Sequence, residues 1–142
     1  MQICLNTSTI KPVPLLEKIK LVGEAGYAGI ELWLNDIWEF VARGGEVSEV
    51  TKALEDHGLI VPSVIAMRQW GDFDGWEHQL VLDEARRRFA LGARLGAPFI
   101  VATPPLENPQ TSHLAARYKE LLQIGREEGI KPTFEYISFF KS

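Results

Sequence analysis

Four joints of the same kind recur along this chain, and they constrain its fold more than any other feature. At each joint a one-sided helical pattern ends at a glycine, and a short apolar run begins within a few residues. The glycines are Gly26, Gly58, Gly96 and Gly129, separated by 32, 38 and 33 residues. This spacing is the length of one βα unit. Glycine suits each joint because it readily adopts the left-handed backbone that often ends a helix.

The apolar runs are short and almost unbroken, which is typical of strands buried on both faces of a parallel sheet. We expect strands over residues 3–5, 29–34, 60–67, 98–103 and 133–140. Apolar residues spaced by three and four predict helices over residues 15–26, 47–54, 77–95 and 114–125. No linker or charge block divides the sequence. Residues 1–142 are therefore predicted to form one α/β domain.

Two arrangements of five parallel strands and four helices fit this pattern. One is about half of a (β/α)8 TIM barrel, and the alternative is a flavodoxin-like doubly wound sheet. The sequence reaches Ser142 soon after the fifth strand, without a fifth helix to cover the sheet, which favours the half barrel. Polar residues stand near the carboxyl ends of four strands: Asn6, Glu31, Thr103 and Glu135. Both folds bind ligands at that edge, so this feature alone does not separate them.

Composition excludes several classes of function. The net charge of −4 provides no basic surface for nucleic acid or an anionic membrane. No segment approaches the roughly 20 apolar residues that a membrane-spanning helix needs. The N-terminal residues lack the charged and apolar regions of a signal peptide, and the single cysteine, Cys4, cannot form an internal disulfide. We expect a cytoplasmic protein with neither nucleic-acid nor membrane partners.

Three segments resemble one family of TIM barrels. They are CLNTSTI at the first strand, GYAGIELWL at the second and KPTFEYISFF at the fifth. The resemblance is to the xylose-isomerase-like barrels, which are sugar or sugar phosphate isomerases and epimerases, with the inosose isomerase type as the nearest look-alike. It covers the whole chain as the front half of such a protein. The endonuclease branch of the family carries histidines after strands three and four, and none follows those strands here.

The resemblance implies a divalent metal (Mn, Mg, Co or Zn), held by residues from strands five to eight. Its ligands would be a Glu, an Asp, a His and a Glu in that order, and only the first has a counterpart here, Glu135. The metal would polarise a substrate carbonyl and its adjacent hydroxyl, while carboxylates move a proton through an enediolate. Because the other three ligands would lie beyond Ser142, we expect this chain alone to bind metal weakly and to lack isomerase activity.

Four other residues are candidates for binding a small sugar or polyol substrate. They are Asn6, Glu31, Trp33 and Arg68. Glu31 could equally form a structural ion pair inside a barrel, and Trp33, like Trp70, could be a core residue. Arg68 could bind an anionic group or simply lie exposed at the rim. The polar run after the first strand, Asn6 to Ser8, lacks the glycines of a phosphate-binding loop.

Three functions follow from these observations. The first is the front half of a metal-dependent sugar or polyol isomerase or epimerase. The second is a non-catalytic half-barrel that associates with itself, most simply as a homodimer, because two open strand edges attract a partner. The third, tied to the flavodoxin-like alternative, is a domain that binds a cofactor or phosphate.

Overall fold

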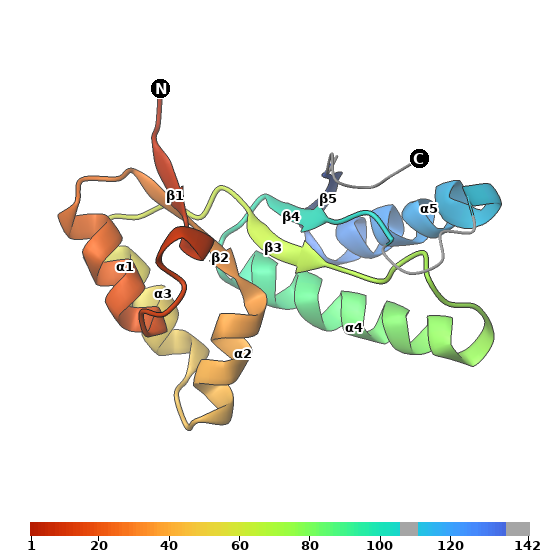
Figure 1. Cartoon of the computed structure of the whole chain (residues 1–142), viewed down its shortest axis with the longest axis horizontal. Coiled ribbons are helices and arrows are strands. Elements are labelled where there is room, and N and C mark those ends of the chain that lie inside the picture. Colours follow the sequence, from red (N-terminus) through yellow and green to blue (C-terminus); the bar gives the residue numbers. More distant parts are fainter. Residues whose placement is uncertain (106–110, 136–142) are drawn as a thin grey trace.

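The computed structural model describes residues 1–105 and 111–135, with five parallel strands in one sheet (Figure 1). The strand order follows the sequence, β1-β2-β3-β4-β5. The strands are β1 (Cys4–Asn6), β2 (Gly29–Trp33), β3 (Val64–Met67), β4 (Phe99–Ala102) and β5 (Lys131–Phe134). Each neighbouring pair is parallel. This sequential order confirms the half barrel and rules out the doubly wound alternative, in which the strand order reverses at a switch point.

The helices gather on one side of the sheet in Figure 1, as they do in a barrel segment. A short 3-10 helix, η1 (Thr7–Ile10), follows β1. The others are α1 (Leu15–Glu24), α2 (Leu34–Ala42), α3 (Val47–Asp56), α4 (Gly75–Arg94) and α5 (Thr111–Glu128). No helix in the described part of the chain is long and apolar enough to cross a membrane.

The four joint glycines have the backbone that their positions predicted. Gly26, Gly58, Gly96 and Gly129 have φ angles of +80°, +63°, +76° and +76°. Each follows a helix closely and precedes a strand. The glycine spacing thus identified all four helix-to-strand joints.

Two helices, not one, connect β2 to β3. The helix predicted over residues 47–54 corresponds to α3 and the strand over 29–34 to β2, but α2 was missed; it begins at Leu34, directly after β2. Leu34 and Ile37 lie on its buried side. A capping box between Glu46 and Glu49 then starts α3, satisfying backbone N–H groups that have no partner within the helix.

Two strands begin at least two residues away from their predicted starts. Residues 60–67 were expected to form one strand, but β3 begins at Val64 and Ile60 makes only an isolated bridge to Gly29. Pro62 lies between them and has no N–H to donate to a neighbouring strand. The fifth strand was expected over residues 133–140, whereas β5 covers Lys131–Phe134. The expectation for residues 136–140 falls outside the described residues.

The core lies between the sheet and the helices. Ile30, Leu32, Val64 and Ile100 point from the sheet into this layer and are fully buried. Phe89 of α4 is the largest fully buried side chain. Side chains alternate between the faces of a strand, so the residues between these positions point the other way. We call that opposite surface the inner face.

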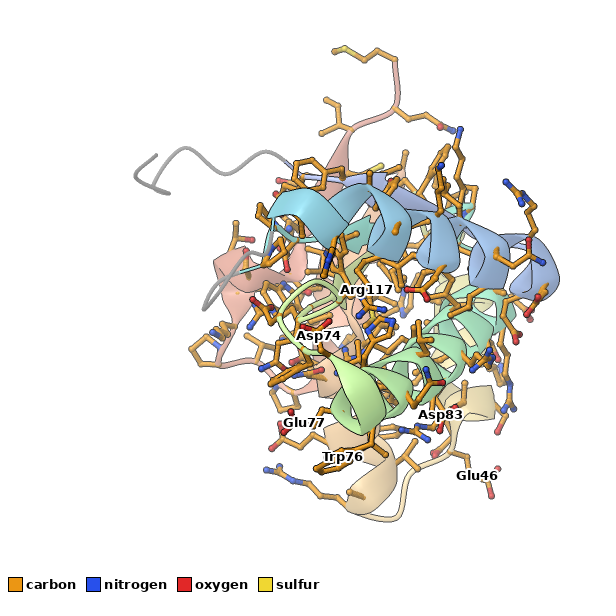
Figure 2. All side chains as sticks on the ribbon, turned by 90° about the vertical axis from the view of Figure 1, so that its right-hand side faces the viewer. Glu46, Asp74, Trp76, Glu77, Asp83 and Arg117 are labelled. Carbon is orange, nitrogen blue, oxygen red and sulfur yellow. The ribbon has the colours of Figure 1, made fainter. Side chains whose placement is uncertain are left out.

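Helices α4 and α5 are also joined by polar contacts outside the sheet. Figure 2 shows Asp74, at the start of α4, beside Arg117 of α5, and their side chains are 2.7 Å apart. Further along, His78 Nε2 lies 2.7 Å from Glu120 Oε2. His78 is buried, so this contact joins the first turn of α4 to the middle of α5. Neither pair lies on the inner face.

Candidate active site

The carboxyl ends of β1 and β2 bring the first candidate residues together. Asn6 ends β1, and the sheet register places it directly opposite Glu31. Parallel strands end at the same edge of a barrel, which is where barrel enzymes bind substrate. Glu31 and Trp33 are two residues apart in β2, so their side chains share the inner face. Three residues chosen separately from the sequence thus form one group.

Both carboxylate oxygens of Glu31 accept hydrogen bonds. Asn6 Nδ2 donates to Oε2 at 2.5 Å, and the Ser63 hydroxyl donates to Oε1. We call these three residues the Glu31 network. Within the described part of the chain, Glu31 has no ion pair. The Glu31 carboxylate is therefore held by hydrogen bonds and not by a structural ion pair.

Trp33 is only half-buried and is not a core residue. Its indole Nε1 lies 3.4 Å from Asn6 Oδ1, which also accepts the backbone N–H of Ser8 at 2.8 Å. Two cations lie close to its ring: Arg68 Cζ is 5.3 Å from the ring centroid, and Lys11 Nζ is 5.9 Å from it. These distances are within the range of cation–π attraction. The structure thus places Trp33 outside the described hydrophobic core.

Sequence reasoning missed two members of this group, Ser63 and Lys11. Ser63 lies just before β3, and its contact with Glu31 follows from the pairing of Leu32 with Val64. Lys11 follows η1, the helix that turns the chain back over the end of β2. Strand register brings Ser63 to Glu31, and the path of the loop after η1 brings Lys11 to Trp33. Neither is part of a motif, so the sequence carried no signal for them.

Trp70 behaves differently from Trp33. It is 2% exposed, and its Nε1 donates to the Thr103 backbone oxygen at 2.6 Å. Tyr118 and Phe134 meet its ring edge-on, with centroids 5.6 and 6.2 Å away. Burial raises the pKa of the Tyr118 phenol, which donates to the Pro132 backbone oxygen at 2.9 Å. This aromatic cluster joins the segment after β3 to α5 and to the end of β5.

Glu135 is separated from the Glu31 network by two strands. It is the first residue after β5 rather than a residue within it, although its backbone N–H still donates to Ala102 at 3.1 Å. Its side chain is exposed. In the sheet alternation it shares a face with Thr133, which pairs with Val101 on the inner face. Glu135 therefore stands at the carboxyl edge, but near the open side of the sheet.

The described residues do not complete a metal site around Glu135. No group of three or more His, Cys, Asp or Glu side chains within residues 1–105 and 111–135 could hold an ion. A divalent metal of this kind takes at least three protein ligands in most catalytic sites. One carboxylate fits the role of a single ligand and does not fit that of a whole site.

Removing the carboxylate of Glu31 should destabilise the fold through this network. Glu31→Leu leaves the Asn6 amide and the Ser63 hydroxyl without their acceptor, at a cost of about 2 kcal/mol. Glu31→Gln keeps one acceptor oxygen and can donate to Ser63, so its cost should stay below about 1 kcal/mol. Urea unfolding would measure both. The exposed Glu55→Leu is the control, expected within about 0.5 kcal/mol of the parent. A Glu31→Leu variant as stable as the parent would show that the network contributes nothing.

Comparisons with known proteins agree with this geometry. A family model described as a xylose isomerase-like TIM barrel matches residues 19–142. A search of curated proteins finds no match. Among solved structures, a xylose isomerase-like TIM barrel/4-hydroxyphenylpyruvate dioxygenase fusion protein is similar over 94% of this chain and 21% of its own, with a TM-score of 0.82 and 21% identity.

Two further structures are similar over half of their length. The IOLI protein, solved with a bound zinc atom, has a TM-score of 0.80 and 19% identity, covering 94% of this chain and 51% of its own. The 3-keto-D-glucoside 4-epimerase YcjR from E. coli has a TM-score of 0.73 and 20% identity, covering 94% and 55%. At such identities the likeness establishes the fold. The chain thus spans about half the length of these two structures.

Proposed function

This chain belongs to the xylose isomerase-like TIM barrel family, and from that premise we propose that it forms the front half of the active site of a sugar or polyol isomerase or epimerase. The observation that supports this most is the Glu31 network beside the half-buried face of Trp33. It lies at the barrel edge where such enzymes bind substrate.

In this proposal the network and Trp33 bind and orient the substrate. An indole face packs against the C–H groups of a sugar or polyol, and fixed polar groups select its hydroxyls. The Glu31 carboxylate has lone pairs beyond those used by Asn6 and Ser63, so it can accept a further hydrogen bond from a hydroxyl. Its two existing partners hold it in position before substrate arrives, which reduces the cost of ordering on binding.

Glu135 would supply one oxygen ligand to a divalent metal such as Mn, Mg, Co or Zn. The zinc in the IOLI structure supports a metal in the family. Because the described residues do not complete a metal site around Glu135, we derive no catalytic step through a metal. We expect the 142-residue chain by itself to be inactive as an isomerase.

Titration with Mn²⁺ tests this assignment. In two-dimensional NMR spectra of the labelled chain, paramagnetic broadening should be strongest around Glu135, and the affinity should be weaker than micromolar because one carboxylate binds alone. Glu135→Gln should abolish the broadening. The control Glu24→Gln, which alters an exposed carboxylate at the end of α1, should leave it unchanged.

Two results would contradict the assignment. Mn²⁺ binding that survives Glu135→Gln would place the metal elsewhere. Conversion of D-xylose to its ketose by the purified chain would show that these residues form a complete site.

A second candidate function rests on the open edges of the sheet. Within the described residues, β1 and β5 each pair with one strand only, and such edges readily pair with another chain. On this basis we also consider a non-catalytic half-barrel that assembles with a second copy of itself. Its test is the oligomeric state of the chain, which is independent of Mn²⁺ binding.

A further inference from the structure

We propose that the substrate of this site is an anionic polyol, whose charged group binds to Lys11 and Arg68 beside Trp33. This inference rests on the proposed function and adds the charge of the substrate to it. Lys11 comes from the loop after η1 and Arg68 from the loop after β3. Residues 57 positions apart in the sequence thus bring two positive charges to one indole ring.

Neither cation is committed to a carboxylate. Within the described residues, neither Lys11 nor Arg68 has an ion pair within 4.0 Å. Arg88 provides a contrast, since its guanidinium is held by Glu84 at 2.8 Å and by the Ala66 backbone oxygen at 3.0 Å. Lys11 and Arg68 therefore keep their hydrogen-bond donors available for a ligand.

Within the described residues, the nearby carboxylate of Glu31 forms no ion pair with Lys11 or Arg68. Glu31 shares the inner face with Trp33, but both of its oxygens already accept hydrogen bonds from uncharged donors, Asn6 and Ser63. In this arrangement Glu31 accepts hydrogen bonds from substrate hydroxyls, and Lys11 and Arg68 bind the anionic group. A neutral sugar would leave both cations without a partner.

The position of the cations over the indole favours binding of an oxyanion. Attraction to the ring restricts each flexible side chain before a ligand arrives, so less conformational entropy is lost on binding.

Carboxylate and phosphate groups share the chemistry that this site would recognise. Both accept charge-assisted hydrogen bonds from lysine and arginine. The substrate would thus be a sugar acid or a sugar phosphate. Three probes with the same six-carbon chain separate these possibilities: D-glucitol is neutral, D-gluconate carries a carboxylate, and D-glucitol 6-phosphate carries a phosphate.

The Trp33 indole N–H resonance reports binding at this position directly. Titrated at constant ionic strength, at least one anionic probe should shift it with a dissociation constant at least about tenfold lower than that of D-glucitol. Arg68→Gln and Lys11→Gln should each weaken that binding by about tenfold. Both side chains are exposed, so the fold should persist. Arg94→Gln, which removes an exposed cation at the end of α4, should leave binding unchanged.

Each result has a distinct meaning. Preference for gluconate identifies a carboxylate, preference for the phosphate identifies a phosphoryl group, and equal preference identifies general oxyanion recognition. If D-glucitol binds as tightly as both anions, the inference is wrong and the proposed polyol site stands. If none of the probes shifts Trp33, the inference and the polyol site both fail, whereas the role of Glu135 is still decided by Mn²⁺.

Discussion

Light scattering of the purified chain should give twice the 16.0 kDa mass of one copy. Among the described residues the sheet is bounded by β1 on one side and by β5 on the other, and such edge strands leave backbone N–H and C=O groups unpaired. A closed barrel has no such edges. A second copy related by a two-fold axis can cover both edges at once, and this is the commonest symmetry of soluble oligomers.

Exposed apolar side chains on the sheet strengthen this expectation. Ile3, just before β1, is 61% exposed, and Phe99 of β4 is 40% exposed. Phe99 lies on the inner face, because its neighbour Ile100 is fully buried towards the helices. Burying a side chain of this size contributes roughly 1.5–3 kcal/mol. A dimer that pairs the β1 edge beside Ile3 and covers the inner face at Phe99 would recover this energy.

Charge placed at these positions should therefore separate the copies. Ile3→Lys and Phe99→Lys should each raise the dimer dissociation constant by at least about tenfold. Leu21→Lys is the matched control, since Leu21 is 41% exposed on α1 in the helix layer. Sedimentation across a dilution series measures all three. A cooperatively folded monomer in the parent chain, or equal effects of the Leu21 and Phe99 variants, would rule out this mode of association.

The fold was largely predictable because its signal is local and repeated. Each glycine joint combines a helix end with a buried strand, and four positive φ angles followed from four glycines. The missed helix, α2, shows the limit of this approach. Its apolar spacing at Leu34, Ile37 and Trp38 begins without a break after β2, so the strand pattern masked the start of the helical one.

The candidate site was predictable only as separate residues. The sequence indicated Asn6, Glu31 and Trp33 by their place at strand ends, but their hydrogen bonds depend on the register between β1 and β2. The position of Ser63 depends on the register of β3, and the position of Lys11 depends on the path of the loop after η1. Glu135 was identified by resemblance, and its distance from the other candidates reflects the two strands between them. Contacts between residues on different strands leave no pattern in the local sequence.

Replacing Gly125 with alanine should be among the most damaging single methyl additions to this chain. Gly125 lies in α5, where the helix packs closely on the approach to β5. A Cβ there would overlap the Ile130 backbone oxygen and stand 2.8 Å from Pro132 Cδ. The Ile130 backbone is also fixed by its N–H, which donates to the Gly125 oxygen at 3.0 Å. The obstacle is therefore backbone that cannot rotate away.

We expect Gly125→Ala to reduce the free energy of unfolding by about 3 kcal/mol, the upper end of the cost of overpacking a core. This loss outweighs the gain of up to about 1 kcal/mol that alanine brings to a helix. Gly92→Ala is the matched control. Gly92 is a buried glycine of α4 whose added Cβ would meet only the ends of two side chains, Ile130 Cδ1 at 2.7 Å and Val64 Cγ2 at 2.9 Å.

Those two side-chain ends can shift, so Gly92→Ala should cost about 1 kcal/mol or less once the helix gain is counted. Urea unfolding of the parent and both variants measures the difference between them. If the two substitutions reduce the free energy of unfolding equally, the backbone at the contact between α5 and the start of β5 shifts as easily as a side chain does. In that case the end of β5, and with it the position of Glu135 at the carboxyl edge, is held less firmly by α5 than the close packing at Gly125 implies.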